Sequence, residues 1–196
     1  MSFIEGVGRD QHTLFPEVLD DYIPFDHPVR FIDAYVDQLD LEALGFIRAA
    51  AADTGRPGYA PGDLLKLYIY GYVNGVCSSR KLERETQRNI ELMWLVRRLR
   101  PDHKTIAEFR RQNRKALKRL FREFTLLCKK LDLFGAELVA IDGSKFRAVN
   151  ARRRNYNRSA LEEIIRSVDE RIAKYLQSME VNDRGDEGRG TPASNP

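Results

Sequence analysis

In this 196-residue chain, Asp142 occupies a position that is suitable for a catalytic metal ligand. Asp142 directly follows the short apolar run 138–141, which has the length and composition of a β-strand. A carboxylate at the end of a rigid strand can be held in the tight oxygen geometry that Mg²⁺ requires. A pair of such ions could activate water or a 3′ hydroxyl for attack on a phosphodiester. The competing interpretation is structural, because Asp142-Gly143 between two strand-like runs is also a common hairpin turn.

The second group of candidate residues is basic. The formal net charge is only +4, but residues 61–135 hold 18 basic and 8 acidic side chains, a balance of +10. Residues 1–60 hold 4 basic and 11 acidic side chains. A basic middle region fits a polyanionic partner, since each Lys or Arg that neutralises a phosphate releases counterions. The alternative is that these cations only cover the outer faces of an ordinary helical bundle.

The elements that must position these cations are predicted to be helices. Pro28 precedes apolar residues at helical spacing up to Leu39, and residues 63–74 are apolar nearly all round, which is typical of a buried helix. Residues 79–88 predict a further helix, and residues 117–131 predict a long amphipathic one.

Two local signals mark the beginnings of the basic helices. Ser78-Ser79 is a helix cap for residues 80–88. Thr105 and Glu108 have the spacing of a capping box, and Asp102 is a second candidate cap for the same helix.

Short helices with arginines on their outer faces are the pattern of a helix-turn-helix module. We expect residues 105–112 to form the helix that reads the DNA, with residues 79–88 as a supporting or competing reader. The expected DNA-binding residues are Arg80, Lys81, Arg84, Arg88, Lys104, Thr105, Arg110, Arg111, Arg114 and Lys115.

The character of the sequence changes after residue 135. Residues 138–141 and 145–149 predict a β-hairpin around Asp142. Ser159 then begins a helix that we expect to reach about Met179. The tail has no large apolar residue from position 182 onward and is expected to be disordered.

Several classes of protein are disfavoured by the sequence. No stretch approaches the roughly 20 apolar residues of a membrane helix, and the first residues do not resemble a signal peptide. Cys77 and Cys128 have no CxxC partner and are expected to be reduced thiols. These features predict a cytoplasmic protein without a membrane partner.

Four segments together resemble a known family. They are residues 56–72, residues 78–95, residues 101–111 and residues 139–145, and their order and spacing are more specific than any one of them. Over roughly residues 10–180 the chain resembles the bacterial insertion-sequence transposases of the DDE type that have an InsH-type N-terminal domain.

The resemblance implies a mainly α fold in three parts. Residues 1–135 would form a helical DNA-binding domain, and residues 136–180 would begin an RNase H-like catalytic domain with the β-hairpin and one long helix. Residues 181–196 would be the disordered tail. The resemblance also implies that Asp142 is the first of three carboxylates that bind Mg²⁺ or Mn²⁺. The implied partner is double-stranded DNA at the terminal inverted repeats of a transposon, which would place the protein at the nucleoid.

The chain departs from the family after Asp142. The family requires a second aspartate and a glutamate on later strands, whereas Asp169 and Glu170 lie on the predicted helix. We therefore expect the chain to be catalytically incomplete and to bind no metal by itself. The alternative is a non-catalytic regulator that binds the same DNA, forms a homo-oligomer or pairs with a full-length transposase.

Overall fold

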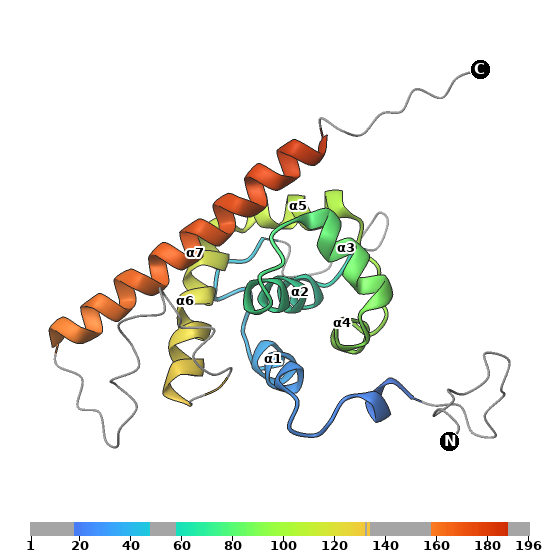
Figure 1. Ribbon diagram of the computed structural model, residues 1–196, viewed down its shortest axis with the longest axis horizontal. Helices are drawn as coiled ribbons and strands as arrows, with labels where there is room; N and C mark the ends of the chain where they lie inside the picture. The colour runs from blue at the N-terminus through green and yellow to red at the C-terminus, as the bar shows by residue number, and fades with distance from the viewer. Residues whose placement is uncertain (1–17, 48–57, 132, 134–157, 188–196) are drawn as a thin grey trace, which may run out of the picture.

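The centre of the fold is the helix α2 (Pro61–Val73), in which residues 63–72 are all buried. Pro61 begins this helix at a position where the missing N–H costs nothing. A helix that is apolar on all sides is stable only when other elements surround it. The computed structural model describes residues 18–47, 58–131, 133 and 158–187, and its other helices are arranged around α2 (Figure 1).

Within the described residues, these other elements are one short 3₁₀ helix and six α-helices. In chain order they are the 3₁₀ helix η1 (Leu19–Tyr22), α1 (Pro28–Asp37), α3 (Ser79–Arg88), α4 (Ile90–Leu95), α5 (His103–Gln112), α6 (Arg114–Lys130) and α7 (Arg158–Glu187). The predicted mainly helical character is confirmed, and so are the predicted helices that begin at Pro28 and at Ser78-Ser79.

Charged side chains inside the core are paired. Lys66 of α2 is 5% exposed, and its Nζ lies 2.5 Å from Asp33 and 2.7 Å from Asp37, both on α1. Asp63 is also buried and accepts two hydrogen bonds from Arg97, at 2.8 and 3.0 Å. A buried charge without such a partner would be costly, so these pairs explain how α2 carries charges at buried positions.

Aromatic rings join α2 to α6 and α7. Tyr72 stacks on Phe121 with ring centroids 4.8 Å apart, and Tyr175 meets Tyr72 edge-on at 5.3 Å. Such pairs add about 0.5–1.5 kcal/mol beyond their buried area. The core around α2 therefore includes a helix that lies about a hundred residues later in the chain.

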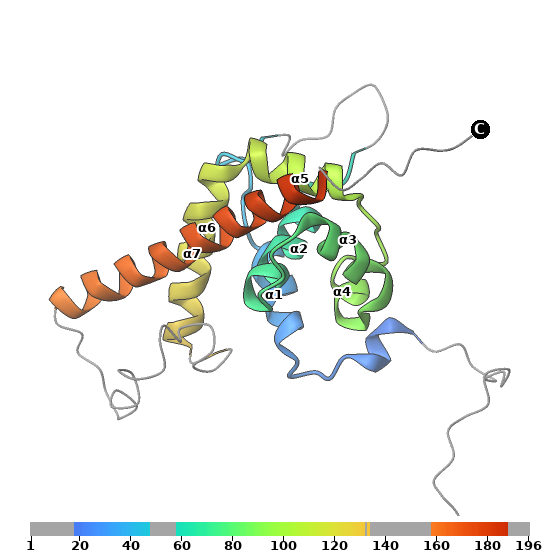
Figure 2. The ribbon, with the colours of Figure 1, turned by 45° about the horizontal axis from the view of Figure 1, so that its top comes forward.

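The longest helix, α7, crosses α6 and ends beside α5 and α3 (Figures 1 and 2). Apolar residues at helical spacing turn one face of α7 into the core. The buried residues on this face are Ile164, Val168, Ile172, Tyr175, Leu176 and Met179.

The predicted end of this last helix is wrong. The disordered tail was expected from residue 181, but α7 continues to Glu187. The residues that extend it have polar partners on the rest of the molecule. Asn182 donates to the carbonyl of Cys77 at 2.6 Å, and the carboxylates of Asp183 and Asp186 accept from Ser79 and Ser78. Tertiary contacts therefore stabilise the last turns of α7, for which the low apolar content alone would predict disorder.

The predicted β-hairpin is not supported, and neither is the RNase H-like sheet that it would begin. Within the described residues the chain forms helices and no β-strand. The hairpin segment itself, residues 138–149, lies outside the described residues. Two short strands are marginally stable in water unless a third strand or a helix covers them. The sequence offers no such third strand, which weakens the prediction of a hairpin.

Gly71 is expected to be required where α2 meets α7. A Cβ at this position would lie 2.8 Å from Tyr175 Oη and 3.0 Å from Leu82 Cδ2. Gly71→Ala should therefore lower the free energy of unfolding by about 1–2 kcal/mol, because overpacking outweighs the helix propensity of alanine. Urea denaturation of the whole chain measures this change.

Gly62→Ala is the matched control on the same helix, because its nearest neighbours would lie at ordinary contact distances of 3.8 and 3.9 Å. It should leave the free energy of unfolding unchanged or raise it slightly. Equal effects of the two substitutions would contradict the close packing of α2 on α7.

Candidate nucleic-acid interface

One face of α3 is strongly cationic. Ser79, Leu82 and Thr86 are buried against the rest of the fold. At about 100° per residue, the opposite side of this helix collects four basic residues within about a quarter to a third of its circumference. They are Arg80, Lys81, Arg84 and Arg88, and we call them the α3 cationic face.

Within the described part of the chain, three of these four cations have no acidic partner. Arg88 forms an ion pair with Glu85 of the same helix. Among the described residues, no ion pair joins a carboxylate to Arg80, Lys81 or Arg84. Lys81 and Arg84 are exposed, and Arg80 is half-buried. Their charges are therefore available to an anionic partner.

The start of α5 lies beside α3. His103 Nδ1 lies 2.8 Å from Glu83 Oε2, which joins the first turn of α5 to the middle of α3. Lys104 follows directly, is exposed, and has no ion pair within the described part of the chain. The structure thus brings one predicted DNA-binding residue of α5 close to the helix that carries the α3 cationic face.

The cap of α5 differs from the predicted capping box. Asp102 is the N-cap, and its carboxylate accepts from the Thr105 N–H at 2.8 Å and from the Thr105 hydroxyl at 3.2 Å. The Thr105 N–H is the main reason that the pKa of Asp102 lies below its ordinary value. Glu108 instead pairs with Arg111 and accepts from Gln112, both at 2.8 Å. Thr105 is therefore occupied in capping.

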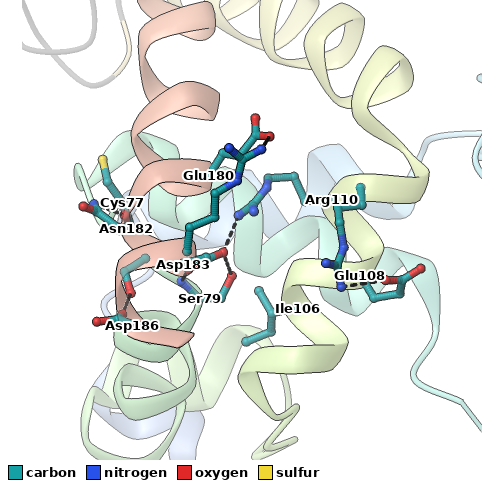
Figure 3. A network of polar contacts seen from close by, with 12 residues as sticks. Cys77, Ser79, Ile106, Glu108, Arg110, Glu180, Asn182, Asp183 and Asp186 are labelled. Carbon is teal, nitrogen blue, oxygen red and sulfur yellow. Dashed lines mark hydrogen bonds and ion pairs between the residues drawn. The ribbon is translucent and has the colours of Figure 1, made fainter. Parts of the chain in front are cut away.

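Arg110 is buried and fully engaged inside the protein. It is 6% exposed, and its Nη1 donates to Asp183 Oδ2 at 2.7 Å (Figure 3). Burial by itself would lower the pKa of Arg110, but Tyr68 and Asp183 together raise it above its ordinary value. This arginine holds α5 to α7 and does not face solvent.

The remaining predicted residues are divided between paired and unpaired cations. Arg114 begins α6 and lies 2.8 Å from Glu180 of α7. Lys115 is exposed and has no ion pair among the described residues. The predicted set therefore does not form one continuous surface, because α7 engages two of its arginines.

The connections from α3 to α4 and from α5 to α6 are very short. Asn89 alone separates α3 from α4, and Asn113 alone separates α5 from α6. The turn of a helix-turn-helix module has three or four residues. Neither pair shows that connection, so the helix-turn-helix assignment stays a prediction.

Sequence reasoning missed the acidic residues of α7. Asp169, Glu180 and Asp183 form ion pairs with Arg122, Arg114 and Arg110 respectively. A signal for them was present in the sequence, since acids at positions 180, 183 and 186 repeat at a spacing that keeps them near one side of a continuing helix. The absence of large apolar residues from position 182 onward concealed that signal.

The expected metal site is not among the described residues. Asp142 lies outside them, and within them no three His, Cys, Asp or Glu side chains lie together as a metal site requires. The assignment of Asp142 to Mg²⁺ or Mn²⁺ stays a prediction from the sequence.

Comparison with known proteins gives one match. Residues 17–112 match the model of the family described as "Transposase domain (DUF772)", a range that includes the described helices from η1 to α5. No curated protein and no solved structure matches the chain. None of the described helices has the length and apolar composition to cross a membrane. The match supports a transposase family and includes the α3 cationic face.

Proposed function

On the premise that residues 17–112 are a transposase domain, we propose that this chain acts in DNA transposition by binding double-stranded transposon-end DNA. The observation that carries the proposal is the α3 cationic face, where three cations without an ion pair among the described residues share one side of a helix. Such a surface can neutralise the phosphate backbone and release its counterions.

The α3 helix is a better candidate reader than α5, which the sequence had favoured. The exposed side of α5 carries Lys104 and Arg111, but Glu108 lies on the same side and pairs with Arg111. The α3 cationic face carries four cations, and Glu85 at its edge engages only Arg88. An anionic duplex would therefore be attracted more strongly to α3.

The two kinds of cation on α3 would serve different purposes. Lys81 and the neighbouring Lys104 of α5 would hold phosphates, which positions the protein on the duplex without reading sequence. Arg80 and Arg84 would be able to make bidentate contacts to guanine in the major groove, which supplies specificity. The transposon ends are the proposed target because of the family match.

The cut-and-join chemistry is proposed from the resemblance to insertion-sequence transposases. Asp142 would supply one carboxylate to Mg²⁺ or Mn²⁺ in the assembled enzyme, and we assign no step of that chemistry to the described residues. The place of action would be the cytoplasm, at the nucleoid.

The double substitution Lys81→Gln and Arg84→Gln tests the DNA-binding proposal. The loss of one phosphate contact from Lys81 and one guanine contact from Arg84 should weaken the affinity for the terminal inverted repeats by about fiftyfold near 0.1 M salt and reduce the salt slope by about 1. Fluorescence anisotropy at several salt concentrations measures both quantities.

The matched control is Arg166→Gln with Lys174→Gln, which removes the same charge from exposed positions of α7 that have no recorded ion pair in the described structure. This control should change the affinity by less than threefold, roughly the scale of an exposed charge outside the interface. An equal loss in both double variants, or no binding by the wild-type chain, would refute the α3 surface as the interface.

A further inference from the structure

A second row of cations runs along the junction of α5 and α6. Three of its members lie on α6 at steps of four residues, which is the spacing of neighbours on a helix surface, and the fourth lies near the end of α5. They are Arg110, Arg114, Lys118 and Arg122, and we call them the α5–α6 row. The described part of α6 is basic as a whole, with seven cations and the single acid Glu123.

The acidic residues of α7 follow this row in the reverse order. Asp183 pairs with Arg110 at 2.7 Å and Glu180 pairs with Arg114 at 2.8 Å. Asp169 then accepts from Arg122 Nε at 2.6 Å. Figure 3 shows the first pair of this arrangement, with Asp183 of α7 directed toward Arg110 of α5. The helix α7, with eight acids and five basic residues, therefore lies antiparallel to the row.

The ion pairs differ in how firmly they are held. Arg110 and Asp183 have side chains only 7% and 11% exposed, so their pair is part of the core. The side chains of Arg114 and Arg122 are 58% and 40% exposed. Ion pairs at exposed positions are weak and are screened by salt. The two outer pairs, Arg114–Glu180 and Arg122–Asp169, can therefore exchange their carboxylates for phosphates. The buried pair Arg110–Asp183 meanwhile keeps α7 in place.

Both outer pairs are held in their charged forms. The hydrogen bond from Arg114 is the main reason that the pKa of Glu180 lies below its ordinary value. The hydrogen bond to Asp169 is the main reason that the pKa of Arg122 lies above its own. A phosphate that displaced either carboxylate would find a charged guanidinium beneath it.

We infer that α7 is an intramolecular competitor for DNA, whose carboxylates Glu180 and Asp169 cover Arg114 and Arg122 against phosphates. This inference rests on the proposed function, because it regulates DNA binding by the same protein. It adds a second contact surface for duplex DNA, formed by the solvent-accessible members Arg114, Lys118 and Arg122 of the α5–α6 row, to the α3 cationic face. It also explains why only some of the basic side chains in residues 61–135 are free of acidic partners.

The double variant Glu180→Gln and Asp169→Asn tests the competition. Both substitutions keep the shape of the side chains and remove the charges that cover the arginines. The affinity of the full chain for a short duplex should rise about tenfold near 0.1 M salt, and the salt slope should become steeper by up to about 2. The gain should therefore shrink as salt is added.

The matched control is Glu163→Gln with Glu170→Gln, which removes two exposed acids of α7 for which no ion pair is recorded in the described structure. An increase in affinity confined to the first double variant supports the competition. Equal affinities of the wild type and the first variant would overturn it, and so would equal gains in both variants, which would indicate a general charge effect.

The Lys81→Gln and Arg84→Gln variant, measured beside these proteins, separates the two proposals. If it loses affinity while the α7 variants behave like the wild type, the α3 interface stands and the competition is refuted. If it binds as tightly as the wild type while the first α7 variant gains affinity, the α5–α6 row is the interface and α3 is not.

Discussion

Replacing Asp183 with alanine is expected to lower the free energy of unfolding by about 3–5 kcal/mol, the range for removing one partner of a buried ion pair. Asp183 accepts from the Ser79 N–H at 2.8 Å, from the Ser79 hydroxyl at 2.7 Å and from Arg110 at 2.7 Å. Alanine would leave the buried guanidinium and the N–H at the start of α3 without an acceptor. The free energy follows from urea denaturation monitored by circular dichroism.

Two comparison variants identify the source of that loss. Glu180→Ala removes an acid of the same helix whose partner Arg114 is largely exposed, so it should cost less than about 1 kcal/mol. Asp183→Asn keeps an oxygen that can accept from the Ser79 N–H, but it replaces Oδ2, which accepts from Arg110 and the Ser79 hydroxyl, with an NH2 group that can only donate. Its cost should therefore be intermediate and closer to that of Asp183→Ala. A cost for Asp183→Ala no larger than that for Glu180→Ala would show that the Asp183 network does not stabilise the fold.

Hydrogen exchange gives a second measure of the same contact. The last turns of α7 are joined to Cys77, Ser78 and Ser79 through side-chain hydrogen bonds. In Asp183→Ala the amides of residues 180–186 should exchange faster, whereas those of the buried helix α2 should keep their order of protection. Unchanged exchange in the last turns would indicate that Asn182 and Asp186 alone hold them.

Local chemistry was sufficient to predict the beginnings of α1, α2 and α3, but η1 and α4 were not predicted. Pro28 and Pro61 stand at first helical positions, and Ser78 accepts from the Lys81 N–H as a cap should. These signals act within one helical turn, so the residues that produce them are adjacent in sequence. The nearly all-round apolar character of residues 63–74 likewise predicted a buried helix.

The position of Arg110 could be predicted only in part. It follows the buried Ile106 by four residues and the buried Ala107 by three, so it lies on the inward side of α5. That periodicity was visible in the sequence, but an arginine at the edge of a basic region resembles a DNA ligand. Its true partner, Asp183, is separated from it by 73 residues, and no local pattern connects the two.

The end of α7 was missed for a related reason. Residues 182–187 contain no large apolar side chain, and composition alone then favours disorder. Their order depends on acceptors and donors in Cys77, Ser78 and Ser79, which only the folded chain brings near. Polar contacts between distant segments thus determine where the helix stops, and they also decide which cations of the basic region face solvent.

Phe121→Ala is expected to have a comparably large effect on stability, about 3–5 kcal/mol, because it removes a completely buried ring. Phe121 of α6 stacks on Tyr72 of α2 at a centroid distance of 4.8 Å, and Tyr175 of α7 meets it at 5.9 Å. The cavity would therefore form where three helices meet. Urea denaturation of the full chain gives the change in free energy.

The same substitution at Phe25, which is 94% exposed, is the control and should change the free energy of unfolding by less than about 0.5 kcal/mol. Because the ring of Phe121 contacts Tyr175, its loss should also loosen the attachment of α7 and raise the affinity for DNA, in the direction expected for Glu180→Gln with Asp169→Asn. If the Phe121→Ala protein is folded and less stable but binds DNA with unchanged affinity, the packing of α7 on the core does not control its competition with DNA. A loss of stability below 1 kcal/mol would instead show that α6 and α7 do not share the core of α2.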